Sequence, residues 1–119
     1  MIVQNLAAQL PFTTKDGSTI HSLLDLANAP VQNQSLAQAT VPSGSATQRH
    51  YHQRSEEFYY ILSGRGSMEI DGEIREVGPG DAILIPPGAW HQITAGVAAP
   101  LVFLCCCAPA YSHEDTYFS

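Results

Sequence analysis

The chain has 119 residues, a length that can bury a core without disulfides, and we expect residues 1–119 to form a single domain. Its formal net charge is -6, and its five Lys and Arg residues form no basic run, which argues against nucleic acid or an anionic membrane as a partner. Its longest apolar stretch, residues 100–110, is shorter than the roughly 20 residues of a transmembrane helix. Since the start also lacks a signal-peptide pattern, we expect a cytoplasmic protein that binds a small molecule.

Short apolar and β-branched runs bounded by Gly, Pro, Asp or Ser recur along the chain, a pattern typical of an all-β sandwich or barrel. The first, residues 22–29, is compatible with a helix or with a strand followed by a turn. Eight strands are then predicted at residues 35–41, 47–52, 58–62, 67–70, 73–77, 82–85, 90–94 and 101–107. Eight strands suit a jelly roll. Asp71-Gly72 predicts a tight hairpin turn, and residues 111–119 are interpreted as a surface extension.

Three consecutive cysteines, Cys105, Cys106 and Cys107, lie in the last predicted strand. Neighbouring residues on a strand point to opposite faces, so the run is unsuited to a disulfide framework. Reduced thiols that pack as small apolar groups are the favoured interpretation. A role as sulfur ligands stays open as the alternative.

A candidate metal site begins in the second predicted strand, where alternation places Gln48, His50 and His52 on one face. The Cα atoms of the two histidines should lie roughly 7 Å apart, so both imidazoles can reach one ion through bonds of about 2 Å. Glu57 and His91 would complete a set of three nitrogens and one oxygen. This set suits one divalent transition metal (Fe, Mn, Zn, Ni, Co or Cu) and leaves positions open for a substrate.

Two longer motifs, at residues 44–64 and 80–95, contain these candidate ligands. The first reads Gly44, five residues, His50-Tyr51-His52, four residues, Glu57, six residues, Gly64. The second reads Gly80, five residues, Pro86-Pro87-Gly88, two residues, His91. Together they resemble the two motifs of the cupin family in its compact bacterial form. The resemblance implies a double-stranded β-helix, the jelly-roll barrel of cupins, with His50, His52, Glu57 and His91 as metal ligands.

The pocket around such an ion should be lined by side chains that share a strand face with the ligands. Tyr59 and Gln48 are therefore the candidates to bind a substrate or to act on it. The alternative for both is a purely structural role as hydrogen-bonded core groups. His21 and His113 lie outside the motifs, and we expect them to be structural or solvent-facing.

The family resemblance leaves the reaction open, because cupins include dioxygenases, decarboxylases, isomerases, lyases and metal-free binders. The complete ligand set favours a metal-dependent oxidoreductase, dioxygenase-like, that acts on a small oxygenated metabolite. The alternatives are a non-catalytic module that binds small molecules or metal, and a metal-dependent isomerase or lyase that uses Tyr59 as acid or base. We also expect a homodimer in which residues 1–12 add to the partner's sheet, as in similar cupins.

Overall fold

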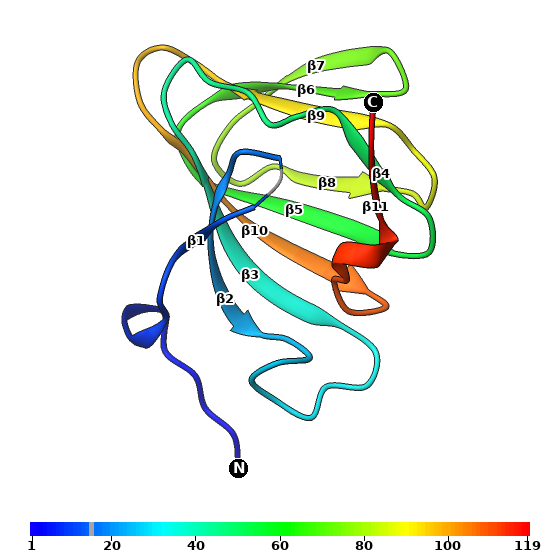
Figure 1. Cartoon of the computed structure of the whole chain (residues 1–119). Coiled ribbons are helices and arrows are strands. Elements are labelled where there is room, and N and C mark those ends of the chain that lie inside the picture. The colour runs from blue at the N-terminus through cyan, green and yellow to red at the C-terminus, as the bar shows by residue number, and fades with distance from the viewer. Residues whose placement is uncertain (15) are drawn as a thin grey trace.

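The computed structural model describes residues 1–14 and 16–119. The strands are β1 (Phe12–Thr13), β2 (Thr19–Leu24), β3 (Ser35–Val41), β4 (His50–His52), β5 (Glu56–Ser63), β6 (Gly66–Ile70), β7 (Glu73–Val77), β8 (Ala82–Ile85), β9 (His91–Ala95), β10 (Leu101–Ala108) and β11 (Thr116–Phe118). Two short 3-10 helices, η1 (Leu6–Ala8) and η2 (His113–Asp115), lie near the ends of the chain. The strands form a six-stranded sheet, β1-β2-β3-β10-β5-β8, and a five-stranded sheet, β11-β4-β9-β6-β7 (Figure 1). The prediction of an all-β jelly roll is confirmed.

All eight predicted strands are present as β3 to β10, with one shift that matters for the site. β4 begins at His50, three residues later than expected. Thr47 turns inward instead of Gln48, because its hydroxyl accepts a hydrogen bond from the backbone N–H of Ile93 at 3.1 Å. Thr47 is therefore buried and Gln48 is exposed, so the predicted alternation that placed Gln48 on the face of the histidines is wrong.

Three strands, the six-residue β2 and the very short β1 and β11, are not among the predicted ones. The undecided residues 22–29 form the end of β2 and a turn, in which Asp25 accepts hydrogen bonds from the N–H groups of Ala27 and Asn28. The expected surface extension at residues 111–119 is wrong for its last part. There η2 leads into β11, which pairs with β4 and covers its edge. A strand of three residues is too short to show a periodic signal in the sequence.

The predicted hairpin turn at Asp71-Gly72 is confirmed. Both residues have positive φ angles, 47° and 90°, and Ile70 pairs directly with Glu73 across the turn. Such a two-residue turn matches the right-handed twist of the strands that it joins. It fixes the register of β6 and β7 at one edge of the five-stranded sheet.

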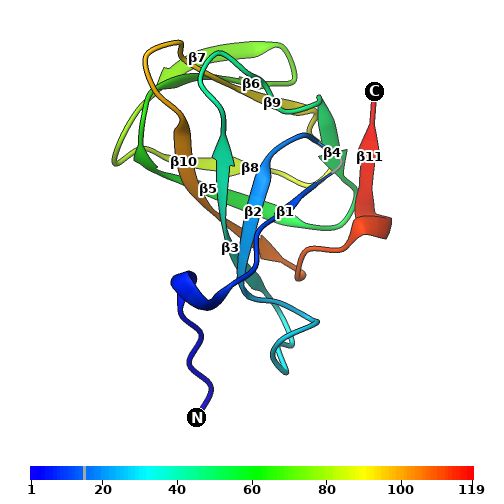
Figure 2. The same ribbon diagram turned by 60° about the vertical axis from the view of Figure 1, so that its left-hand side comes forward.

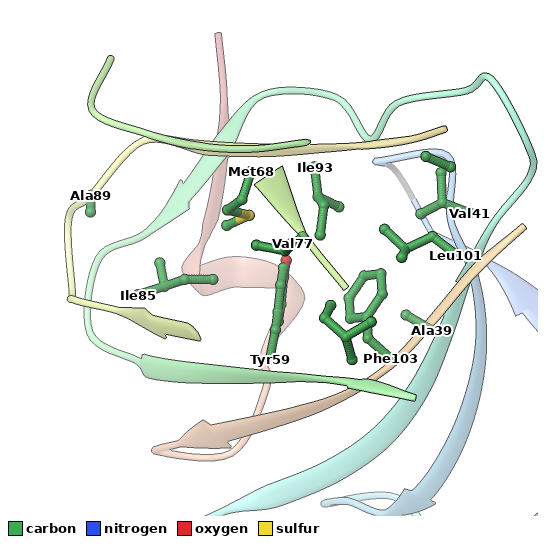
Figure 3. Packing of buried hydrophobic residues seen from close by; sticks show 12 residues of the cluster. Ala39, Val41, Tyr59, Met68, Val77, Ile85, Ala89, Ile93, Leu101 and Phe103 are labelled. Atoms are coloured by element: carbon green, nitrogen blue, oxygen red, sulfur yellow. The ribbon is translucent and has the colours of Figure 1, made fainter. Parts of the chain in front are cut away.

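The apolar core lies between the two sheets (Figure 3). Ile61 and Phe103 come from the six-stranded sheet and Ile93 from the five-stranded sheet, and each is at most 1% exposed. Full burial of such a side chain contributes about 2 kcal/mol. Tyr59 lies between this core and the buried histidines. The centroid of its ring is 4.5 Å from that of Phe103 and 6.1 Å from that of His91.

The chain before β1 runs away from the two sheets, as both views show (Figures 1 and 2). Several apolar side chains there are exposed, among them Ile2, Val3 and Leu10. Within the described residues, the helices are too short to cross a membrane.

Candidate metal centre

Three imidazoles meet between the sheets. His50 and His52 both point inward from β4, and His91 pairs with His50 across β4 and β9. One nitrogen of each ring lies within 4.8 Å of the corresponding nitrogens of the other two. Two ligands that are each bonded to the same ion at about 2 Å lie at most about 4 Å apart, so a small inward shift of the rings would let all three bind one ion.

Glu57 reaches the same place from β5, on the opposite sheet. Its Oε1 lies 3.2 Å from Nε2 of His52 and 3.5 Å from Nε2 of His91. The three histidines and Glu57 are at most 5% exposed. The structure therefore brings all four predicted ligands into one buried cluster, with Glu57 on the side of His52 and His91.

Backbone carbonyls fix the orientation of two of the rings. Nδ1 of His50 lies 2.7 Å from the carbonyl oxygen of Gln48, and Nδ1 of His91 lies 3.0 Å from that of Ala89. A carbonyl oxygen can only accept, so Nδ1 carries the proton in both rings. In the neutral rings, Nε2 then keeps a free lone pair that can bind a metal.

A side chain from β11 orients the third ring. Thr116 lies opposite His52 in the β4–β11 register, and its Oγ1 is 3.1 Å from Nδ1 of His52. The Thr116 hydroxyl donates its own proton to the carbonyl oxygen of Ser112 at 3.1 Å. Its oxygen is thus left to accept from Nδ1, which gives His52 the same tautomer as the other two rings.

The carboxylate of Glu57 is supported by one of the cysteines. Cys107 pairs with Glu57 across β5 and β10, and its Sγ lies 3.1 Å from Oε2 of Glu57. Burial, together with the charge of Glu57, raises the pKa of the Cys107 thiol, so the thiol stays protonated and donates to the carboxylate. All three cysteines are free. The sequence missed this contact, and also Thr116, because both depend on strand register.

The charges in the cluster are strongly coupled. Burial disfavours the charged form of Glu57, but the contacts with His52 and His91 outweigh it and hold the Glu57 pKa well below its usual range. Burial likewise opposes a charge on His52, but Glu57 outweighs it and raises the His52 pKa. The pKa of His50 is lowered by burial and by the neighbouring His91. Without an ion, the Glu57 carboxylate therefore favours the protonated form of His52.

Two atoms of the cluster need a partner that the described residues do not provide. Oε1 of Glu57 and Nε2 of His91 are buried and make no hydrogen bond within the described part of the chain. Buried polar atoms without a partner are rare in folded proteins. A divalent ion would satisfy both, and three imidazoles with one carboxylate are a donor set that such ions accept. The residues present therefore fit a metal ion.

Three residues of the cluster, His50, His52 and Glu57, line a cavity with an empty volume of about 720 Å³, the solvent at its mouth included. Tyr59 also lines this cavity, as expected from its position on β5. The exposed side chain of Gln48 is not among the described lining residues; its contribution is the peptide carbonyl that orients His50. Asp16, which does line the cavity, was missed, although Asp16-Gly17 carries the same turn signal as Asp71-Gly72.

Comparison with known protein families gives a match to the cupin domain over residues 37–107. The chain is 53% identical over 106 residues to the uncharacterized protein MJ1618 of Methanocaldococcus jannaschii, which covers 89% of this chain and 85% of that protein. It is 30% identical over 96 residues to the protein SchB of Streptomyces halstedii, covering 79% of this chain and 70% of SchB.

Among solved structures, the chain is similar to Pac13 from Streptomyces, which is described as a nucleoside dehydratase. The TM-score is 0.79 at 19% sequence identity, and the match covers 100% of this chain and 91% of Pac13. At that identity the similarity shows a shared fold.

Proposed function

Since this chain belongs to the cupin domain family, we propose that it is a metal-dependent enzyme, an oxidoreductase of the dioxygenase kind, that acts on a small oxygenated molecule. The observation that carries the proposal is the buried convergence of three imidazoles and a carboxylate, of which His50, His52 and Glu57 line a cavity. Within it, Glu57 and His91 each have a polar atom that the described residues leave without a hydrogen bond.

In this proposal His50, His52, His91 and Glu57 hold one divalent transition ion, which would supply Lewis acidity toward an oxygen atom of the substrate. The backbone carbonyls and Thr116 keep the three rings in the tautomer that binds a metal. Phe103 and Phe118 line the cavity and exclude water from its walls. Burial, followed by the charge of Glu57, raises the pKa of Tyr59, so its hydroxyl holds its proton beside the site.

Similar proteins carry the names of several reactions. A segment of 49 residues is 33% identical to the 5-aminosalicylate 1,2-dioxygenase of a Comamonas species, which agrees with the proposal. Another, of 69 residues, is 32% identical to the 4-deoxy-L-threo-5-hexosulose-uronate ketol-isomerase of Escherichia coli. The protonated Tyr59 beside His91 favours the second candidate function, an isomerase or lyase that uses this hydroxyl as acid or base.

Metal analysis tests the proposed site. We expect protein purified without added metal to contain close to one transition ion per chain. Replacing His50, His52, Glu57 or His91 singly by Ala should lower that content strongly, because each change removes one bond to the ion. His21→Ala and His113→Ala are the matched controls and should keep the ion. Full occupancy in all four site variants would contradict the proposal.

Oxygen uptake separates the candidate reactions. A dioxygenase should consume oxygen when it converts its substrate, whereas an isomerase or lyase should turn over under argon. Tyr59→Phe, which removes one hydroxyl, should lower kcat in the second case and leave the metal content unchanged. Saturable binding of a substrate without any turnover would indicate a non-catalytic binding module instead.

We also propose a homodimer in a reducing compartment such as the cytoplasm. Residues 1–12 expose Val3 and Leu10, and the outer face of β5 exposes Phe58 and Tyr60, each at 45% or more. Exposed apolar side chains of this kind support association with a second copy. Light scattering should give about twice the chain mass of 12.8 kDa, and a mass near 12.8 kDa would contradict the dimer. The three free cysteines support the reducing compartment.

A further inference from the structure

We propose that the cavity selects a ligand that is uncharged apart from the oxygen atoms that face the metal centre, and that Asp16 enforces this choice. In this proposal the Asp16 carboxylate accepts a hydrogen bond from a hydroxyl group at the far end of the ligand. The inference rests on the proposed function, because it concerns a ligand of the same cavity.

The charges on the cavity wall disfavour a second anionic group on the ligand. The described lining residues include three carboxylates, those of Asp16, Asp25 and Glu57, and they include no Lys or Arg. Glu57 already belongs to the metal centre. A second anionic group on the ligand, such as a phosphate or a further carboxylate, would therefore meet like charge, which costs binding free energy. A neutral hydroxyl group would instead find an acceptor.

The carboxylate of Asp16 is held in place with one oxygen left over. Its Oδ1 accepts hydrogen bonds from the Thr14 hydroxyl, from the N–H of Ser18 at 2.9 Å and from the Ser18 hydroxyl at 2.6 Å. Its Oδ2 has no hydrogen-bond partner among the described residues. Asp25 differs, because Ser22 occupies its Oδ2 and the N–H groups of its own turn occupy its Oδ1. With respect to the described residues, Asp16 is thus the carboxylate outside the metal centre that has an acceptor oxygen without a partner.

The turn that contains Asp16 is connected to the metal centre by hydrogen bonds through the backbone of one residue, Gln48. The carbonyl oxygen of Asp16 accepts from the N–H of Gln48 at 2.7 Å, and the carbonyl oxygen of Gln48 accepts from Nδ1 of His50 at 2.7 Å. In Figure 2 the β1–β2 hairpin approaches β4 from the front. Asp16 and His50 therefore line one cavity from neighbouring, mutually fixed segments.

The remaining walls determine what can lie between Asp16 and the ion. Phe12, Ile20, Phe103 and Phe118 present apolar surface to the cavity. Such walls bind a carbon framework by removing it from water. The expected ligand thus has a pair of oxygen atoms for the ion, an apolar or aromatic body, and a hydroxyl group at the opposite end.

A matched pair of small diols tests the proposal on protein loaded with Co²⁺. The compounds are 3,4-dihydroxybenzyl alcohol and 3,4-dihydroxybenzoate, which share the ring and the metal-binding diol and differ in charge at the far end. The Kd of each is measured from the change in the visible cobalt spectrum. We expect the alcohol to bind at least about fivefold more tightly than the acid, because the carboxylate of the acid is repelled by the nearby carboxylate of Asp16. Asp16→Asn should bring the two Kd values together.

Two control variants show where the preference originates. Glu73→Gln makes the same change in charge at an exposed residue outside the cavity lining and should leave the ratio unchanged. Lys15→Ala removes the cationic side chain next to Asp16 in the sequence. The proposal would be overturned if the wild-type protein bound the acid more tightly than the alcohol, or if Asp16→Asn left the ratio of the two Kd values unchanged. A preference for the acid that Lys15→Ala abolishes, or binding of neither diol, would overturn it as well. Failure to bind Co²⁺ would instead overturn the metal site itself.

Discussion

Thr116 is the residue outside the ligand set on which the geometry of the site depends most directly. Its hydroxyl accepts a hydrogen bond from Nδ1 of His52 and donates one to the carbonyl oxygen of Ser112, so it fixes both the tautomer and the orientation of that ring. Removing such a supporting partner typically weakens metal binding by about 10- to 100-fold. Thr116→Val keeps the shape of the side chain and removes the hydroxyl. We expect this loss of Zn²⁺ affinity, measured by competition with a chromogenic chelator.

Thr116→Ser is the matched control, because it retains the hydroxyl and removes a methyl group. It should bind Zn²⁺ nearly as tightly as the wild-type protein, while Thr116→Val should not. Equal weakening in both variants would mean that Thr116 acts through the packing of β11. Wild-type affinity in Thr116→Val would mean that the hydroxyl has no role in orienting His52.

The sequence was sufficient to predict that four side chains gather in one cluster and insufficient for the residues that support them. His50, His52, Glu57 and His91 could be found because their spacing is short-range and characteristic of a family. Thr116 and Cys107 contact the ligands through pairing of strands more than 45 positions apart. No local pattern encodes such pairing, since register depends on the whole sheet. Gln48 was misplaced because a hydrogen bond from Ile93 to Thr47 overrides the alternation.

At the scale of the element, the eight strands β3 to β10 were predictable from their apolar and β-branched runs, whereas the very short β1 and β11 and the six-residue β2 were not. β1 and β11 have two and three residues, and their pairing with longer neighbours holds them in the sheets. β11 nevertheless supplies Thr116 and Phe118 to the cavity. The short edge strands therefore shape the site, whereas the long central strands build the core.

The turn at Gly64, which ends the first motif, provides a prediction about the fold itself. Gly64 has a φ angle of 82°, and a Cβ atom there would lie 2.2 Å from the carbonyl oxygen of Pro100. Gly64→Ala adds this clash to a backbone strain of about 1–3 kcal/mol. We therefore expect a loss of about 4 kcal/mol in the free energy of unfolding, measured with urea.

Gly80→Ala is the matched control, because it separates the cost of the backbone conformation from the cost of the steric clash. Gly80 has a similar φ angle of 91°, but no atom of residues 1–14 and 16–119 lies within 4 Å of its added Cβ. This variant should lose about 1–2 kcal/mol, the cost of the left-handed conformation alone. Equal losses in the two variants would show that the close approach of Pro100 relaxes without cost.

At the scale of the whole molecule, the site and the core occupy the same space between the sheets. His91 is as completely buried as Ile93, two residues further along β9. The apolar cluster supplies the stability of the fold, so we expect the metal-free protein to remain folded. The ion then adds stability in proportion to its binding, about 4 kcal/mol at a free concentration one thousand times its Kd.

Acid should remove the stabilisation that the ion adds, because protons and metal compete for the same nitrogens. The folded pKa of His50 is already depressed, so its contribution is present above the unfolded value of about 6.5 and is lost as the pH falls through the folded value. Without metal, the contribution of His52 to stability has the opposite pH dependence. Its pKa is raised, so this contribution is present below about pH 6.5 and is lost as the pH rises through the folded pKa. A bound ion requires His52 to be neutral and reverses this dependence. Melting curves of metal-free protein and of protein with excess Zn²⁺ should thus differ clearly in Tm at pH 7 and much less at pH 5. A difference in Tm that stays constant between the two pH values would show that the ion is held by groups other than these histidines.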